Sequence, residues 1–356
     1  MNSNWAINQF KSEDLSKIRL FFKRLYTGMG AYGSIDLFNW KIQENYVSTG
    51  IINLIKDGNK IISTTSLTPK FLYFKGKNQI VAEIGDTYTD PDYQRKGLFS
   101  MLINQTRKDA EDKGISFIYG TPNKQSLPGY EKKANFKTIN NINVYSMSLP
   151  INISPIISRK SYWILGNIFG SFYLIFILCF YELKKLINKA YSLKEIIEIE
   201  IIPNDWDDFW EKAHVSHDFI FLRDLKAIEW RFINHPNKYR VYILKQHNEL
   251  IGYLTYRILH EKGIINLVIA DFLVLKGREE YLKSLLFRVL KDSIEHNVTK
   301  IYIWCPQDSP YFKILKDFGF MRGSNVPVIC YQNDFASEIQ DSCHKWHFTI
   351  SDSDNI

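Results

Sequence analysis

Apolar and polar positions alternate along several short segments in the first half of the chain, and apolar positions recur at helical spacing between them. Alternation over 51–55 and 61–73, around the turn residues Asp57-Gly58-Asn59-Lys60, predicts a β-hairpin. A third β-prone run, from Ile80 to Thr89, leads into a helical pattern that Gly114 ends. The pattern therefore predicts an antiparallel meander followed by a helix.

The next segments continue the alternation of strand and helix. Residues 115–120 form an apolar run, a short helix carrying Tyr130 follows, and the run at 142–149 is expected to close the sheet. Helices at the start, a meander, and then alternating strands and helices predict an α+β fold, with one mixed, mostly antiparallel sheet flanked by helices.

The order of elements recurs from about residue 197. Residues 239–258 read as a hairpin and 264–274 as the next strand, before a long helical pattern at 279–296. A strand at 301–304 follows, and Ser309-Pro310-Tyr311 begins a segment that mirrors the one carrying Tyr130. Two folds of the same type in tandem are therefore expected.

An apolar segment joins the two halves. Residues 161–181 contain no charged side chain, and Lys and Arg flank both ends, so the segment is long enough to be a membrane-span candidate. A span would separate the halves across a bilayer, which a shared active site forbids. We expect a buried helix between the domains or in a homo-oligomer, and we keep peripheral membrane contact and a true span as alternatives.

Size, charge and cysteine content narrow the class of protein. The 356 residues suit two domains, and 45% hydrophobic with 23% charged residues is typical of a globular chain. The net charge of +7 suits phosphate-bearing ligands, but no Lys/Arg run interleaved with aromatics predicts nucleic-acid binding. The four scattered cysteines predict neither disulfides nor a metal site, and the N-terminus lacks an apolar signal core. The expected location is the cytoplasm, with membrane association through 161–181 as a variant.

The turn at 94–99, Gln-Arg-Lys-Gly-Leu-Phe, lies between a predicted strand and a predicted helix. Such a turn aims several backbone N–H groups and the positive end of the helix dipole at one point, which favours phosphate. It resembles the acyl-CoA pyrophosphate loop of the GNAT superfamily of N-acyltransferases, with pattern Q/R-x-x-G-x-G/A. Phe99 departs from that pattern, since the family usually keeps a small residue there.

Two neighbouring segments extend the resemblance. The strand from Glu83 to Thr89 corresponds to the one that splays from its parallel neighbour in GNAT folds and pairs with the pantetheine arm of CoA, and Gly85 fits a bulge there. The segment 123–136 resembles the next family motif. The resemblance implies an acyl-CoA cosubstrate, acetyl-CoA or a hydroxyacyl-CoA, held by Thr87, Tyr88, Thr89, Gln94, Arg95, Lys96, Gly97, Leu98, Phe99, Asn123 and Ser126.

Acyl transfer to an amine needs a base for the ammonium proton and an acid for the departing thiolate. All eight histidines lie at or after His214, so a base from the first half must be a carboxylate or a water relay. Asp86 and Glu83, beside the expected thioester, are the candidate bases, and Tyr130 is the candidate acid by its position in the motif. His214 and His217 are an alternative base from the other half, and a structural pair is the favoured interpretation of them.

The second half differs at the loop. Its equivalent turn reads Lys276-Gly277-Arg278-Glu279-Glu280, and two adjacent carboxylates would repel a pyrophosphate. The second half resembles that of tandem-GNAT proteins, among which are N-acyltransferases of nucleotide-linked amino sugars. We therefore predict an acyl-CoA-dependent N-acyltransferase of that type. The alternatives are an aminoacyl transferase of the cell-wall-peptide type and a membrane-associated acyl-CoA sensor or scaffold.

The expected domain organisation follows from these segments. We predict a GNAT domain with the acyl-CoA loop at 1–150, an apolar helical linker at 151–196, a degenerate GNAT-like acceptor-side domain at 197–335, and a polar tail at 336–356. No metal site is predicted.

Overall fold

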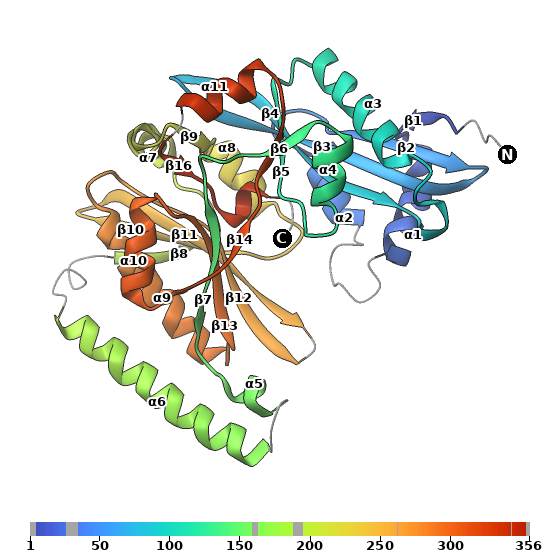
Figure 1. The fold of residues 1–356 in the computed structure, drawn as a ribbon. Coiled ribbons are helices and arrows are strands. Elements are labelled where there is room, and N and C mark those ends of the chain that lie inside the picture. Colours follow the sequence, from blue (N-terminus) through green and yellow to red (C-terminus); the bar gives the residue numbers. More distant parts are fainter. Residues whose placement is uncertain are drawn as a thin grey trace.

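The computed structural model describes residues 5–25, 35–158, 163–187, 195–261, 263–342 and 344–353. Within these ranges the chain forms two mixed β-sheets flanked by helices (Figure 1). The predicted α+β class with two such sheets is therefore confirmed.

The first sheet is built mainly from the first half of the chain. Its β2–β3 hairpin turns at Gly58, which has a φ of +57°, as the sequence predicts. Along this order the pairing is antiparallel except between β4 and β5. In spatial order the strands are β1 (Ile7–Gln9), β2 (Ile51–Asp57), β3 (Lys60–Phe74), β4 (Lys77–Thr89), β5 (Phe117–Gly120), β15 (Ile329–Tyr331) and β6 (Phe136–Thr138).

The second sheet repeats this arrangement. Its parallel pair, β12 with β13, occupies the place of β4 with β5. In spatial order the strands are β8 (Glu195–Ile199), β10 (Arg240–Gln246), β11 (Glu249–Glu261), β12 (Ile264–Val274), β13 (Lys300–Pro306), β7 (Val144–Pro150) and β14 (Met321–Val326). The predicted recurrence of the fold is thus present strand for strand.

The two halves exchange one strand. β7, expected to close the first sheet, pairs instead with β13 and β14 of the second sheet, and Figure 1 shows it in green between orange and red strands. β15, from the second half, takes the equivalent place between β5 and β6 of the first sheet. The expectation for 142–149 was therefore wrong, because a short apolar strand does not specify in which of two similar sheets it pairs.

Helices cover both sheets. In the first half they are α1 (Leu15–Leu25), α2 (Ile35–Phe38), α3 (Leu98–Asp112) and α4 (Leu127–Lys133). In the second half they are α7 (Trp206–Ala213), α8 (Leu225–Ile228), α9 (Leu282–Glu295) and α10 (Pro310–Phe318). Short helical turns are η1 (Ser12–Asp14), η3 (Asn39–Gln43), η4 (Pro91–Tyr93), η6 (His214–Ser216), η7 (Glu229–Ile233), η8 (Glu279–Tyr281) and η9 (Ile350–Asp352).

A pair of tryptophans marks the contact between the halves. η3 and η7 are π-helical turns at equivalent places, and they carry Trp40 and Trp230. The two indole rings stack with centroids 4.3 Å apart. Each indole N–H donates to the other residue's carbonyl, Trp40 Nε1 at 2.8 Å and Trp230 Nε1 at 3.3 Å. This reciprocal contact relates the halves by an approximate two-fold symmetry.

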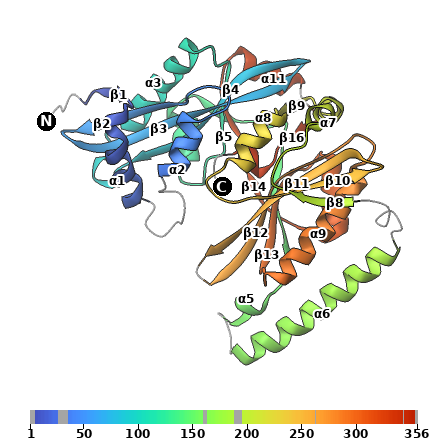
Figure 2. The ribbon, with the colours of Figure 1, turned by 180° about the vertical axis from the view of Figure 1, so that it is seen from behind.

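The apolar segment between the halves forms α6 (Trp163–Ile187), preceded by α5 (Ser154–Ser158). α6 runs along the outside of the second half, on the far side from the first sheet (Figures 1 and 2). The expectation of a buried helix between the domains is wrong, because only one face of α6 is covered. No helix within the described ranges has the length and hydrophobicity that crossing a membrane requires.

The last segment of the chain is not a polar tail. After α11 (Asp334–Ser342), β16 (Trp346–His347) pairs with β9 (Phe219–Phe221), which in turn pairs with the end of β3. Trp346, Phe348 and Ile350 are buried. Residues 346–353 therefore form part of the core between the two sheets, which the polar composition of the segment did not predict.

Candidate active site

The loop after β4 has the backbone shape expected of a phosphate site. Arg95 and Gly97 adopt left-handed conformations, with φ of +62° and +83°. α3 begins at Leu98, and the amide of Met101 donates to Gly97 O at 3.1 Å as the first helical hydrogen bond. The three amides of residues 98–100 therefore project from the helix N-terminus, where the dipole favours an anion.

The side chains of the loop have separate tasks. Lys96 lies over the ring of Tyr93, with Nζ 4.7 Å from its centroid, and Gln94 Nε2 donates to Thr89 O at 3.3 Å. The side chains of Gln94, Arg95 and Lys96 are exposed. Leu98 is buried and anchors the helix start in the core. The cations Arg95 and Lys96 thus stand directly before the projecting amides in the chain, exposed to solvent.

Phe99, which departs from the family pattern, is turned toward α4. Its ring packs edge-on against Tyr130, with centroids 5.2 Å apart. A side chain at Gly129 would meet the Phe99 ring, since a Cβ there would lie 3.3 Å from it. Gly129 thus makes room for the ring that replaces a small residue, and the Phe99 amide remains at the helix end.

The strand beside the loop separates from its neighbour as expected. β4 pairs with β5 only from Val81 to Glu83, whereas beyond Glu83 it pairs with β3 alone among the described strands. The β3–β4 register shifts between Thr64 and Ser66, and Asp86 in this bulge has a φ of +46°. The expected bulge is therefore present, one residue after Gly85. The splayed edge from 84 to 89 offers backbone groups to an added strand-like ligand.

Tyr130 lies beside the bulge. Its hydroxyl donates to Thr87 Oγ1 at 2.8 Å, and Thr87 Oγ1 is 2.8 Å from Thr65 Oγ1. Burial raises the pKa of Tyr130 well above its usual value, so the phenol keeps its proton at any physiological pH. The structure thus brings together Tyr130, Thr87 and the splayed strand.

Asp86 is held at the bulge by a cation that the sequence did not single out. Asp86 Oδ2 accepts from Lys41 Nζ and from Ser66 Oγ, each at 2.8 Å. Among the described residues no hydrogen bond engages Asp86 Oδ1, and the side chain is 28% exposed. One carboxylate oxygen is therefore fixed while the other remains open to a substrate.

Glu83 has a different environment. Glu83 Oε2 accepts from Lys70 Nζ at 2.7 Å, and the two side chains are only 3% and 6% exposed. Thr121 Oγ1 donates to Glu83 Oε1 at 3.4 Å. This carboxylate is sealed in a buried ion pair, which suits a structural or positioning role better than proton transfer with an incoming amine.

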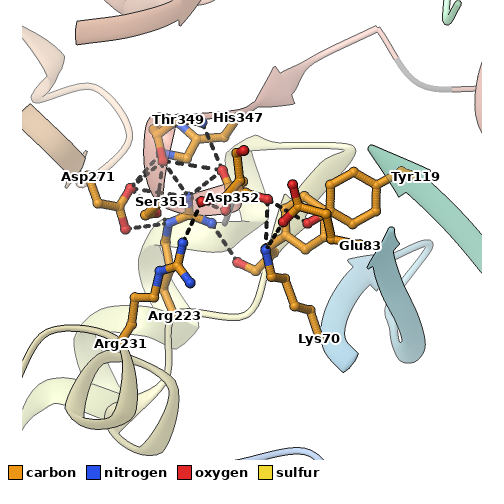
Figure 3. A network of polar contacts seen from close by, with 12 residues as sticks. Lys70, Glu83, Tyr119, Arg223, Arg231, Asp271, His347, Thr349, Ser351 and Asp352 are labelled. Atoms are coloured by element: carbon orange, nitrogen blue, oxygen red, sulfur yellow. Dashed lines mark hydrogen bonds and ion pairs between the residues drawn. The ribbon is translucent and has the colours of Figure 1, made fainter. Parts of the chain in front are cut away.

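Lys70 and Glu83 belong to a network that reaches the second half and the last residues of the chain (Figure 3). Lys70 Nζ and Tyr119 Oη both donate to Asp352 O, at 2.9 Å and 2.5 Å. The Asp352 carboxylate accepts from Arg223, at 2.8 Å for the shorter contact, and Arg223 also forms a bidentate pair with Asp271. The network joins β3, β4, β12 and η9 into one buried unit.

The electrostatics of this unit are dominated by Arg223. Burial alone would raise the pKa of Asp271, but the Arg223 guanidinium outweighs it and holds that pKa well below its usual value. The adjoining cavity has a volume of about 30 Å³, room for about two waters. We infer that this unit fastens the halves together rather than binding a substrate.

The two histidines considered as an alternative base are buried. His214 Nδ1 lies 2.9 Å from Trp210 O, and the His217 ring packs 5.0 Å from that of His347. Burial lowers the pKa of His217 well below its usual value, so its ring is neutral near pH 7. Both residues pack as a structural pair would. Among the described residues, no group of three or more His, Cys, Asp or Glu is placed to hold a metal.

The remaining predicted residues lie at the edge of the site. Asn123 Oδ1 accepts from the amides of Gln125 and Ser126, at 2.9 Å and 3.0 Å, so it shapes the turn into α4. Tyr88 packs edge-on against Phe21 of α1, with centroids 5.9 Å apart. Thr89 Oγ1 lies 2.8 Å from Ser63 Oγ. These contacts hold the splayed strand and the turn in place.

Sequence reasoning missed Lys41, Lys70, Arg223 and Asp352. A signal existed for one of them: Lys70 stands in an apolar strand, and Thr68, two residues earlier, pairs with Glu83 in the neighbouring strand. Lys70 is therefore the diagonal cross-strand neighbour of Glu83, and the two charged side chains lie on the same face of the sheet. The others contact their partners only through the tertiary fold.

Comparisons with known proteins agree with this geometry. Residues 8–136 match the family model described as Acetyltransferase (GNAT) domain. That match covers most of the first sheet and its loop and supports a GNAT-type acyltransferase domain in the first half of the chain. No curated protein matches the sequence.

Three solved structures share the fold. A GCN5-related N-acetyltransferase from Anabaena variabilis is 13% identical, with a TM-score of 0.61 over 92% of this chain and 72% of that one. A probable N-acyltransferase from Enterococcus faecalis is 12% identical, with a TM-score of 0.61 over 92% and 72%. Saccharomyces cerevisiae N-myristoyltransferase with bound myristoyl-CoA is 12% identical, with a TM-score of 0.61 over 93% and 83%. At such identities the likeness concerns the fold alone.

Proposed function

We propose that the first half binds acyl-CoA and transfers its acyl group to a primary amine held between the halves. The observation that carries this proposal is the splayed edge of β4, next to a helix N-terminus with projecting amides and beside the buried Tyr130 hydroxyl. In this arrangement the amides of residues 98–100 bind the pyrophosphate, with Gln94, Arg95 and Lys96 around it. The pantetheine arm pairs with 84–89.

The chemistry assigns a task to each group at the bulge. The amine nitrogen attacks the thioester carbonyl carbon, its C–N bond forms, and the C–S bond breaks as the tetrahedral intermediate collapses. A backbone N–H of β4 stabilises the oxyanion. Asp86 Oδ1 accepts the ammonium proton, and Tyr130 gives its proton to the departing thiolate. Lys41 and Ser66 hold Asp86 in position.

Glu83 is the less favoured base, because its carboxylate is already ion-paired with Lys70. We propose that it positions the β4–β5 junction instead. The domain limits 1–150, 151–196 and 197–335 remain our division of the chain by function, although the exchanged strands β7 and β15 tie the two halves together.

For the acceptor we propose an amino sugar on a nucleotide carrier, which rests on the resemblance of the second half to tandem-GNAT proteins. For the acyl group of the donor we compare three candidates. Acetyl-CoA fits the family model, a hydroxyacyl-CoA fits the tandem type, and myristoyl-CoA is the donor bound by a solved relative in fold.

A thiol-release assay tests the activity. Each of the three donors is offered with a panel of nucleotide-linked amino sugars, and free CoA is measured with a thiol reagent, while calorimetry measures CoA binding separately. Turnover with a nucleotide-linked amino sugar is the expected result. Saturable CoA binding without turnover on any amine would favour the sensor or scaffold, and absence of CoA binding would refute the site itself.

A further inference from the structure

The outer face of α6 carries a concentration of exposed apolar side chains. Among the described residues, 14 large hydrophobic side chains are exposed, and eight of them lie on this one helix. Phe172 is 68% exposed, Phe176 62% and Phe169 59%. The others are Ile168, Ile175, Leu178, Phe180 and Leu183. A contiguous patch of this kind marks an interaction surface.

The inner face of the helix is fixed to the second half. Ile177 and Tyr181 are buried, and Tyr181 Oη donates to Phe318 O at 2.7 Å. Gly170 lies against Ser154 of α5 so closely that no side chain would fit there. Because these contacts fix the rotation of α6, its exposed stripe points away from the body of the molecule.

Packing beneath α6 is incomplete. A pocket of about 440 Å³ remains between α6 and α9, lined in part by Leu178, Phe287 and Ile294. Figures 1 and 2 show the helix extending along the second half, remote from the first sheet and its loop. Among the described residues the helix is therefore supported on one side only, and its outer side is open to a partner.

The charges around the helix indicate which partner. From 168 to 180 the helix carries no charged residue. Arg159 and Lys160 precede it in sequence, and Glu182, Lys184 and Lys185 follow the stripe, so each end keeps a net positive charge. Two copies packed along this stripe, parallel or antiparallel, would bring like charges together at both ends. An anionic membrane surface instead accepts the apolar stripe and attracts both basic ends.

We propose that the outer face of α6 docks on a bilayer surface containing anionic lipid. The helix lies in the plane of the interface, with its exposed phenylalanines among the upper acyl chains. Inner-face contacts stay in place, so the body remains on one side of the membrane. This inference is independent of the acyl-transfer proposal.

Vesicle cosedimentation of the full chain tests it. The probes are vesicles of phosphatidylcholine with and without phosphatidylglycerol. The double variant Phe172→Asp/Phe176→Asp should lower partitioning onto phosphatidylglycerol vesicles by at least about tenfold, because it replaces two apolar anchors by charges. Leu20→Asp/Met321→Asp is the matched control, since both residues are exposed apolar positions elsewhere, and it should bind like the unmodified chain.

Two further arms separate the outcomes. Lys184→Gln/Lys185→Gln, or higher salt, should weaken binding to phosphatidylglycerol vesicles and leave that to pure phosphatidylcholine unchanged. Circular dichroism and thermal unfolding verify that every variant is folded. Failure of the unmodified chain to bind, or equal binding by the phenylalanine variant, overturns the proposal. A dimer that only the phenylalanine variant dissociates, without vesicle binding, overturns it in favour of a second copy.

Discussion

The two halves share one topology and differ where ligand chemistry would occur. In the first half the loop amides at 98–100 project freely, whereas in the second half Glu279 Oε1 accepts from the Gly277 amide at 3.0 Å. Both loops have a left-handed glycine, Gly97 and Gly277. With these glycines aligned, residues 278–280 are the counterparts of 98–100. Arg278 N already donates to Leu275 O at 3.0 Å, and the Glu279 carboxylate closes the loop on the Gly277 amide.

The β-bulges of the two halves also differ in their side chains. β12 shifts register against β11 between Thr255 and Tyr256, and Ala270 stands at the place that Asp86 occupies in β4. The following residue, Asp271, is paired with Arg223 in the network that joins the halves. Within the described residues, the second half thus keeps the architecture but has an alanine in the bulge and a carboxylate inside the loop. We infer that it supports the first half rather than forming a second site of the same kind.

The largest expected effect tests the difference between the two loops. Gly97→Asp should weaken CoA binding about a thousandfold, because a carboxylate about 4 Å from a pyrophosphate charge costs about 4 kcal/mol at an effective dielectric constant near 20. Gly277→Asp, at the same backbone conformation in the second half, is the matched control and should leave affinity unchanged. Calorimetry with CoA measures both. Equal losses would mean that the two loops are not functionally distinct.

The next effect concerns the bulge. Asp86→Asn should lower kcat roughly a hundredfold to a thousandfold with little change in CoA affinity, because it removes the base while asparagine tolerates the left-handed backbone. Glu83→Gln should change kcat much less and destabilise the fold, since it leaves Lys70 buried without its carboxylate. Steady-state kinetics and urea unfolding of both variants decide which carboxylate is the base.

A third prediction concerns the support formed by the second half. Asp271→Asn should lower the free energy of unfolding by about 3 kcal/mol, because Arg223 loses one of its two buried carboxylate partners. The lowered pKa of Asp271 means that its contribution is complete above the unfolded-state pKa of about 4 and is lost as the pH falls through the folded-state pKa. Urea unfolding at pH 7 and below pH 4 checks this: the difference between the two proteins should shrink in acid. A constant difference would contradict the assignment.

The smallest effect distinguishes two tyrosines. Tyr130→Phe should lower kcat by about a hundredfold, the low end for a general acid, because it removes the proton donor to the thiolate. Since its pKa is raised, the unmodified enzyme should show no decline of kcat from this group up to pH 10. The Tyr311 hydroxyl accepts a hydrogen bond from Val274 N at 3.0 Å. The control variant Tyr311→Phe should therefore lower stability but leave kcat unchanged. A fall in kcat for both variants would indicate a general packing effect.

Local pattern was sufficient for the elements of the candidate site. The hairpin around Gly58, the strand into the loop, the helix from Leu98 and the helix with Tyr130 each depend on residues close in sequence. The repetition of these elements in the second half was predicted for the same reason. Lys41, Arg223 and Asp352 were not found, because nothing near them in the chain indicates the partner that they meet across the fold.

The sequence by itself determined the strand-loop-helix unit and its repetition, because turn residues, glycine conformation and apolar period act over a few residues. Tertiary structure alone decided that β7 and β15 change places, that residues 346–353 are buried, and that α6 has an uncovered face. The physical reason is that similar sheets offer equivalent edges to any short apolar strand. Which edge it joins depends on the packing of the whole chain.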